Sequence, residues 1–201
     1  MIIIKNIIFD LGGVILEDKP NTFLKDLNID KDIYDQLNIF FDNWQEMDLG
    51  NCTLEEKYSS CNYSSIINDK YKEYLIYYYK YRKINNELLN IIDKLKMNNY
   101  NVYILSDNNK EAFEYYMSNN LFNNIDGYII SYEYKTLKRG GKLFDILLNK
   151  YNLKGSECYF IDDSLININE AKKHGINCYL YNNNDDLYKN MISNGINIKE
   201  D

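Results

Sequence analysis

The chain has 201 residues, of which 45% are hydrophobic, and a formal net charge of −7. This length can bury one sizeable core and leaves room for a smaller accessory domain, and the hydrophobic content excludes a wholly disordered chain. The negative charge argues against a nucleic-acid-binding protein, because such proteins usually present a basic patch or stripe.

The cysteines and the N-terminal residues indicate the cellular compartment in which we expect the protein. The four cysteines form no C-x-x-C pair and the sequence has a single histidine, so no classical zinc set is present and reduced thiols are expected. The run MIIIKNIIF at the start lacks the basic region and the cleavage site of a signal peptide. No stretch approaches the roughly 20 apolar residues of a membrane-spanning helix. We therefore expect a cytoplasmic protein that does not bind membranes.

Short apolar runs alternate with helical patterns along most of the chain. The predicted strands cover residues 2–10, 101–107, 127–131, 157–163 and, more weakly, 177–181. The helices predicted between them cover residues 85–98, 109–119, 141–151 and 165–174. Strands that are apolar at nearly every position are typical of a parallel sheet covered on both faces. The alternation therefore predicts an α/β fold with a Rossmann-like, doubly wound parallel sheet.

Residues 17–84 interrupt this alternation. They contain helical patterns over 31–44, 53–60 and 70–82 and no convincing strand. Thr53 followed by Glu56 three residues later is the pattern of a capping box at a helix start. We therefore expect an α/β core made of residues 1–16 and 85–201, with a small helical domain, residues 17–84, inserted after the first strand.

Polar residues end three of the predicted strands. Asp10 ends the first strand, Ser106 and Asp107 end the second, and Asp162 and Asp163 end the fourth. Because the carboxyl ends of parallel strands lie at one edge of the sheet, we expect these side chains to meet. Carboxylates that lie together resist joint ionisation unless a cation binds, and their hard oxygen atoms suit Mg²⁺. A serine hydroxyl beside them is a good donor to a phosphate oxygen.

Each of these residues also has a purely structural interpretation. Asp10 precedes two glycines and could cap the following turn. Asp162 and Asp163 could form the N-cap of the helix predicted near residue 165, and Ser106 could be a local cap. The sequence leaves both interpretations open at each single position.

The four segments that contain these residues resemble, in order, the four motifs of the haloacid dehalogenase superfamily. They are FDLGGVI (9–15), LSDNN (105–109), LKRGGKLFDILL (137–148) and FIDDSLININEAKKHGI (160–176). Members of this superfamily are mostly Mg²⁺-dependent phosphatases with an aspartate nucleophile. The resemblance covers essentially the whole expected core and implies hydrolysis of a small phosphorylated metabolite.

The resemblance also implies a role for each matching residue. Asp10 would attack phosphorus and form an aspartyl-phosphate, which splits hydrolysis into two easier displacements. Ser106 would bind the transferring phosphoryl group. Magnesium would be bound by Asp10, the backbone carbonyl of Gly12, Asp162 and Asp163, the last either directly or through a metal-bound water.

The third motif is expected to supply a lysine that holds the nucleophile and the phosphate. In relatives this lysine generally precedes a proline and lies six residues before an aromatic residue, so Phe144 selects Lys138. Lys142 is the alternative if the two intervening glycines shift the loop. Arg139 occupies the position of the proline. Asp107 occupies a position that is often Asn in the branch of the superfamily described in the next paragraph. Both residues are candidates for substrate binding.

The first motif departs from the usual pattern at Gly12. Most phosphatases of the superfamily have a second aspartate there, which serves as general acid and base. The form D-L-G-[GN]-V-I occurs in a branch that includes bacterial phosphatases acting on α-glucose 1-phosphate, so a sugar phosphate is the favoured substrate. Glu17 or Asp18 could replace the missing acid.

The alternative function is a module that binds a phospho-ligand or a protein without catalysis. Dehalogenation is less favoured, because that reaction needs no metal and would leave the paired acids Asp162 and Asp163 unexplained.

The superfamily carries its cap between the first two motifs, where this chain has residues 17–84. Such a cap closes over the site, excludes water and selects the leaving group. Trp44, Glu46 and Tyr58 are the candidates to face the substrate.

Overall fold

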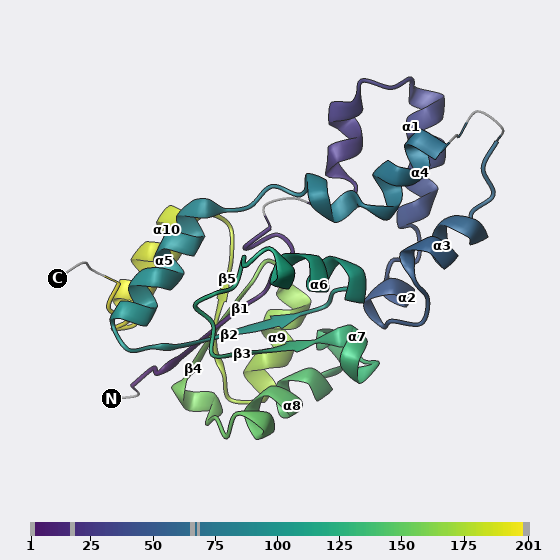
Figure 1. Cartoon of the computed structure of the whole chain (residues 1–201). Helices are drawn as coiled ribbons and strands as arrows, with labels where there is room; N and C mark the ends of the chain where they lie inside the picture. The colour runs from purple at the N-terminus through teal and green to yellow at the C-terminus, as the bar shows by residue number, and fades with distance from the viewer. Residues whose placement is uncertain (1–2, 17–18, 65–66, 68, 199–201) are drawn as a thin grey trace.

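The computed structural model describes residues 3–16, 19–64, 67 and 69–198. Its centre is a sheet of five parallel strands in the order β3-β2-β1-β4-β5 (Figure 1). The strands are β1 (Asn6–Phe9), β2 (Asn101–Ser106), β3 (Gly127–Ile130), β4 (Cys158–Asp162) and β5 (Asn177–Leu180). This confirms the predicted Rossmann-like parallel sheet, although β1 is shorter than the strand predicted over residues 2–10.

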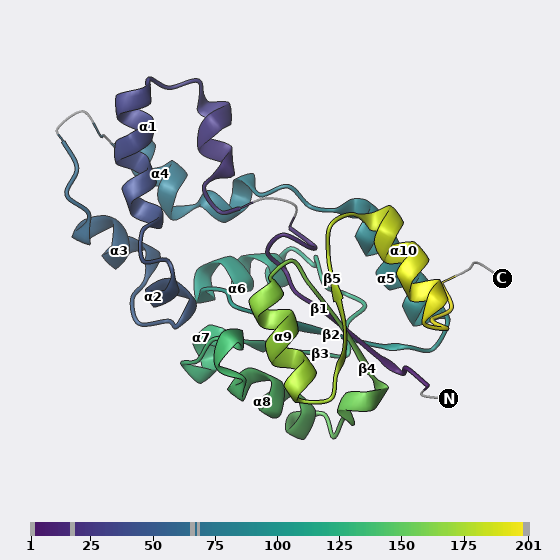
Figure 2. The same ribbon diagram turned by 180° about the vertical axis from the view of Figure 1, so that it is seen from behind.

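Helices cover both faces of the sheet, so the core has three layers (Figures 1 and 2). The helices are α5 (Asn86–Met97), α6 (Lys110–Ser118), α7 (Ser131–Tyr134), α8 (Lys142–Lys150), α9 (Leu165–Lys173) and α10 (Asn184–Ser193), with the 3₁₀ turns η4 (Lys138–Gly140) and η5 (Gly155–Glu157). Ile7 and Phe9 of β1 pack with residues of α5, α6 and α10, and Ile8 packs with α8 and α9. Burial on both faces explains why the strands are apolar at most positions.

Helix α10 is not predicted from the sequence. Its start lies in the asparagine-rich run YNNNDD, whose biased composition hides the capping residue. In the structure the Asn183 side chain accepts a hydrogen bond from Asp186 N at 2.9 Å. Leu187 and Met191 are fully buried in the core. The helix is therefore defined by an N-cap and two buried side chains spaced four residues apart.

The segment between β1 and α5 is helical, and no named strand occurs in its described residues. It contains η1 (Thr22–Leu27), α1 (Lys31–Asn38), η2 (Ile39–Phe41), α2 (Gln45–Asp48), α3 (Leu54–Ser60), α4 (Asp69–Ile76) and η3 (Tyr78–Tyr81). In Figure 1, α1 and α4 lie beyond one end of the sheet, while α2 lies close to α6 and α7.

Two of the helices predicted in this segment are wrong in length. The helix predicted over 31–44 ends at Phe41, because Asp42 is extended and Asn43 has a left-handed φ of 52°. Asparagine tolerates this conformation better than most residues, so it breaks the helix where hydrophobic periodicity continues. The helix predicted over 70–82 divides into α4 and η3.

The capping box at α3 is confirmed. The Thr53 hydroxyl accepts from Glu56 N at 3.1 Å, and the Glu56 carboxylate accepts from Thr53 N at 2.8 Å. These two bonds satisfy donors that a helix start otherwise leaves unpaired.

Aromatic side chains fill the interior of the helical segment. The Trp44 ring lies 6.0 Å from Phe40 and 5.1 Å from Tyr78, between ring centroids.

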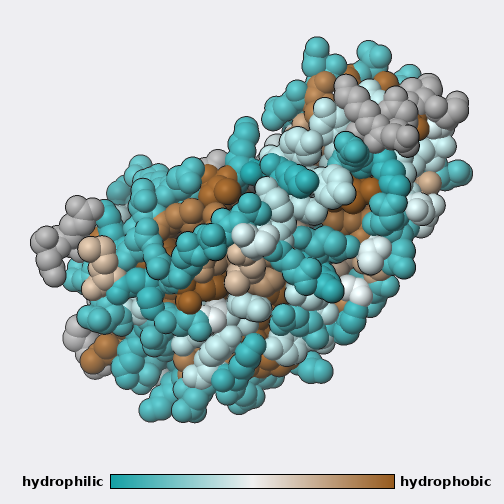
Figure 3. Space-filling model, viewed as in Figure 1, coloured by the Kyte–Doolittle hydropathy of each residue, from teal (hydrophilic) through white to brown (hydrophobic). Residues whose placement is uncertain are grey.

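On the face seen in Figure 1, hydrophilic side chains cover most of the surface and hydrophobic ones form separate patches (Figure 3). In the described part of the chain, no helix combines the length and the apolar character needed to cross a membrane.

Candidate active site

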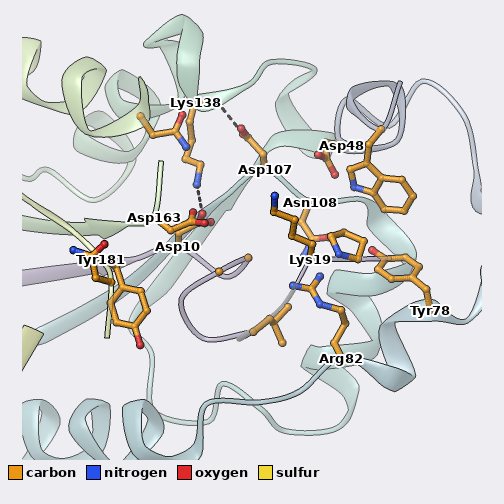
Figure 4. A pocket seen from close by; sticks show the side chains of 17 residues that line it. Asp10, Lys19, Asp48, Tyr78, Arg82, Asp107, Asn108, Lys138, Asp163 and Tyr181 are labelled. Carbon is orange, nitrogen blue, oxygen red and sulfur yellow. Dashed lines mark hydrogen bonds and ion pairs between the residues drawn. The ribbon is translucent and has the colours of Figure 1, made fainter. Parts of the chain in front are cut away.

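The predicted site residues meet at the carboxyl ends of the central strands. β1 lies between β2 and β4, at the point where the chain switches direction across the sheet, which is where open α/β sheets form their binding crevice. Asp10 directly follows β1, and its backbone N donates to Ile161 O of β4 at 2.9 Å. A cavity of about 580 Å³ opens at this edge (Figure 4).

Lys138 is buried at the centre of this group. Only 1% of its side chain is exposed, and its Nζ lies 2.7 Å from Asp10 Oδ2 and 2.7 Å from Asp162 Oδ2. Its backbone N donates to Asp107 Oδ1 at 2.9 Å, which fixes η4 against the end of β2. Lys142, the alternative, is exposed at the first position of α8. The structure therefore brings Lys138 to the carboxylates and leaves Lys142 outside.

Burial and neighbouring charges set the protonation of this group. Burial raises the pKa of Asp10 to about 8; Lys138 opposes the rise and Asp162 adds to it. Burial alone would lower the pKa of the Lys138 ammonium, but the carboxylates of Asp10, Asp162 and Asp107 raise it above its usual value. The site thus places the Lys138 ammonium group among carboxylates that resist joint ionisation, which favours binding of a further cation.

Three carboxylates are arranged to share a metal ion. Asp10, Asp162 and Asp163 each offer an oxygen atom, and these atoms lie within 4.8 Å of one another. Asp162 Oδ1 also accepts from Ser164 N at 2.7 Å, but Ser164 is the N-cap residue of α9 and no side chain caps this helix, so the N-cap predicted at Asp162 and Asp163 is wrong. An all-oxygen donor set of this kind fits Mg²⁺.

The two glycines after Asp10 have different surroundings. Gly13 has φ +75°, and a Cβ there would overlap the Asp163 carboxylate. Gly12 lines the cavity, and a Cβ there would meet no atom within 4 Å. Gly13 thus allows the close approach of Asp163, whereas at Gly12 the missing side chain leaves open space beside Asp10.

Some of the remaining predicted residues lie at the site, and others lie away from it. Ser106 is fully buried and its hydroxyl donates to Asp107 O at 3.4 Å, while its nearness to Asp10 lowers the pKa of that carboxyl. Asp107 and Trp44 line the cavity. The exposed Arg139 hydrogen-bonds Gln45 instead of lining the cavity, and Glu46 and Tyr58 do not line it either. Glu17 and Asp18 lie outside the described residues.

The cavity also contains residues that the sequence analysis did not select. They include Lys19, Asp48, Tyr78, Arg82 and Asn108. Asp48 is the most unusual, because it is an acid that is only 9% exposed. No local pattern signals it, since its burial depends on how α2 packs against residues far away in the sequence.

The chain belongs to the haloacid dehalogenase-like hydrolases, since the model of this family matches residues 4–175. A curated relative, the D-ribitol-5-phosphate phosphatase of Bacteroides thetaiotaomicron, is 27% identical over 204 residues, which cover 91% of this chain and 94% of the relative.

Solved structures of the same family share the fold. A haloacid dehalogenase-family enzyme of Bacteroides thetaiotaomicron, in complex with magnesium and inorganic phosphate, superposes with a TM-score of 0.69 and 22% identity, over 89% of this chain and 94% of that chain. A haloacid dehalogenase-like hydrolase of Porphyromonas gingivalis gives a TM-score of 0.72 and 20% identity, over 95% and 97%.

Proposed function

We propose that the protein is a Mg²⁺-dependent phosphatase that hydrolyses a small phosphorylated metabolite, with a sugar phosphate favoured, through an aspartyl-phosphate on Asp10. The observation that carries this proposal is the position of Lys138, whose ammonium group joins Asp10 and Asp162 in a buried site beside Asp163. The relative named as a D-ribitol-5-phosphate phosphatase and the structural neighbour with bound magnesium and phosphate support the same conclusion. The predicted cytoplasmic location stays a proposal.

In the first step, an oxygen of Asp10 bonds to phosphorus and the bond to the leaving group breaks. Lys138 balances charge on Asp10 and on the phosphoryl group, while the Ser106 hydroxyl donates to a phosphoryl oxygen. In the second step, water attacks phosphorus and releases Asp10. Asp10, the Gly12 carbonyl, Asp162 and Asp163 would hold Mg²⁺, which neutralises charge on the phosphate when bound.

We further propose that residues 17–84 act as the cap of this site. Trp44, Asp48 and Tyr78 of this segment line the same cavity as Asp10. Their aromatic and acidic side chains suit a polyhydroxylated substrate, because such compounds combine hydrogen-bonding groups with apolar C–H surfaces. The cap would therefore choose the leaving group, while the core binds the phosphate.

The test is phosphate release from a panel of phosphorylated metabolites, including D-ribitol 5-phosphate and α-glucose 1-phosphate, with MgCl₂ or with EDTA. We expect turnover that needs Mg²⁺ and that falls by at least about 10³-fold in Asp10→Asn, because the nucleophile is lost. Glu46→Gln, at an exposed position outside the cavity, is the matched control and should keep the parental rate. Equal turnover in Asp10→Asn and the parent would falsify the phosphatase proposal.

One observation favours a second candidate function. Gly12 leaves open space where most relatives have an acid, and a site without that acid could bind a phosphorylated ligand and not turn it over. Calorimetric binding of a phosphate mimic with Mg²⁺, together with no phosphate release from any panel member, would support this non-catalytic module.

A further inference from the structure

Asp48 is a buried acid in the wall of the cavity that none of the four motifs contains. It ends α2, its side chain is 9% exposed, and it lines the same cavity as Asp10 and Lys138. Its Oδ1 is buried and accepts no hydrogen bond from any part of the chain that the structure describes. In Figure 4 its carboxylate lies on the Asp107 side of the cavity. A buried polar atom without a partner is costly, so its retention beside a cavity points to a partner that enters with the substrate.

The backbone holds Asp48 in a fixed position relative to the core. The Ser131 hydroxyl donates to Asp48 O at 2.5 Å, and the same hydroxyl accepts from Asn108 N at 3.0 Å. Asn108 belongs to the loop that follows β2 and Ser106. Asp48 is therefore anchored to the loop directly after Ser106, and not only to its own helical segment.

The surroundings of Asp48 favour the protonated form of its carboxyl group. Burial raises its pKa well above the usual value, and the nearby carboxylates of Asp107 and Asp10 add to the rise. Lys138 and the Trp44 side chain lower the pKa of Asp48 but do not cancel the rise. The Tyr78 phenol, whose own pKa is raised chiefly by burial, faces the same region. A buried carboxylic acid whose pKa is raised can donate its proton to a substrate.

We propose that Asp48 is the general acid and base of the reaction, in place of the acid that Gly12 lacks. This inference rests on the proposed phosphatase function. As Asp10 bonds to phosphorus, the bond between phosphorus and the leaving oxygen breaks, its electron pair stays on that oxygen, and Asp48 gives that oxygen its proton. Asp48, now a carboxylate, then takes a proton from the water that bonds to phosphorus. The bond between phosphorus and Asp10 breaks, and phosphate leaves with Asp10 and Asp48 both restored.

The proposal is tested by the leaving-group dependence of Asp48→Asn. Phenyl phosphate and p-nitrophenyl phosphate have almost the same shape, but nitrophenolate leaves readily without a proton, whereas phenolate benefits from protonation. Single-turnover and steady-state rates are measured for both, and for the metabolite that the panel identifies as the best substrate. The asparagine keeps the size of the side chain, but it cannot supply an acidic proton.

We expect the rate with phenyl phosphate and with the metabolite to fall by about 10²- to 10⁴-fold in Asp48→Asn, which is the usual contribution of a general acid. The rate with p-nitrophenyl phosphate should fall by less than about 10-fold, because this substrate needs little protonation. Glu46→Gln, an exposed change on the same helix, should leave both rates at the parental value. Thermal unfolding of both variants checks that they are folded.

The possible results separate the two proposals. Equal losses with both aryl phosphates would show that Asp48 binds the phosphate or supports the fold, and unchanged rates would show that it takes no part; either result overturns its role as acid and base. If the parent releases phosphate from no substrate, the phosphatase function fails and the role of Asp48 fails with it.

Discussion

Gly12 and Gly13 are adjacent, but only Gly13 needs to be glycine. Gly13 has φ +75°, and a methyl group there would overlap the Asp163 carboxylate. Gly13→Ala should therefore lower the free energy of unfolding by at least about 1–2 kcal/mol, the usual cost of a left-handed conformation for a residue with a side chain. Gly12→Ala adds a methyl group in open space and should change stability by less than about 0.5 kcal/mol.

Urea denaturation of the two glycine variants, followed by circular dichroism, measures this difference. Equal destabilisation by both substitutions would contradict the conformation described for this turn.

Lys138 is the second residue at which a single substitution is informative. It is buried and its ammonium group pairs with Asp10 and Asp162, so Lys138→Met leaves two carboxylates without their cation. Breaking a buried ion pair costs about 3–5 kcal/mol, and we expect a loss of stability of this size together with the loss of turnover. Part of the stability should return with MgCl₂, because a bound cation replaces some of the missing charge.

Lys142→Met is the control for this experiment, because Lys142 is exposed at the start of α8. Urea unfolding with MgCl₂ and with EDTA measures both variants. The assignment of the third-motif lysine to Lys138 would be refuted by a larger effect in Lys142→Met.

Among the helical elements, α3 offers the clearest test of local stability. Thr53→Ala removes the hydroxyl that accepts from Glu56 N and should lower the free energy of unfolding by about 1 kcal/mol. Ser59→Ala, on the same helix, removes only a bond from its exposed hydroxyl to Glu55 O and should cost much less. Chemical denaturation compares the two variants, and a larger loss in Ser59→Ala would count against the cap.

The elements that could be predicted from the sequence are those whose residues show a clear local pattern. The strands are predictable because both faces are buried, which leaves a continuous apolar run in each. The break after Phe41 is not, because it depends on a left-handed Asn43 in a sequence that keeps helical periodicity. The cap of α10, Asn183, lies among other asparagines, so the start of this helix carries no distinct signal.

The candidate site likewise contains residues that the sequence predicts and a residue that it does not. Asp10, Ser106 and Asp162 can be found because each ends or directly follows a strand, and the parallel sheet then brings these positions together. The spacing to Phe144 is enough to favour Lys138 over Lys142, and the buried ion pairs of Lys138 agree with it. Asp48 cannot be found in this way, because its place in the cavity depends on the contact between α2 and the loop after β2.

On the scale of the whole molecule, several contacts join the helical segment to the core at the edge that carries the site. Glu111 of α6 accepts from Leu54 N at 3.0 Å, at the start of α3. Asn109 donates to the Tyr78 hydroxyl at 2.8 Å, and Ser131 binds the backbone of Asp48. Opening of the proposed cap would require breaking these polar contacts, two of which lie at the loop after β2 and at Ser131 beside it. Binding of a ligand between the two parts should therefore stabilise the entire fold.

This coupling gives a prediction about metal binding and pH. In the metal-free protein, burial raises the pKa of Asp163 and raises that of Asp10 to about 8, so the folded state holds protons that the unfolded state releases near pH 4. These groups therefore favour folding below pH 4, and their contribution is lost as pH rises toward 8. Mg²⁺ binds the ionised carboxylates, so the stabilisation by Mg²⁺ should grow as pH rises from 5 to 8.

The measurement is the thermal midpoint at pH 5, 6, 7 and 8, with MgCl₂ or with EDTA at matched ionic strength. At a Mg²⁺ concentration about 100 times its dissociation constant, the gain should approach about 2.7 kcal/mol, and each kcal/mol raises the midpoint of a chain of this size by about 2–4 °C. Asp163→Asn should lose most of the gain, whereas Asp126→Asn, at an acid outside the cavity that pairs with Lys96, should keep it. A gain that stays constant with pH, or that survives in Asp163→Asn, would mean that Mg²⁺ acts elsewhere on the protein.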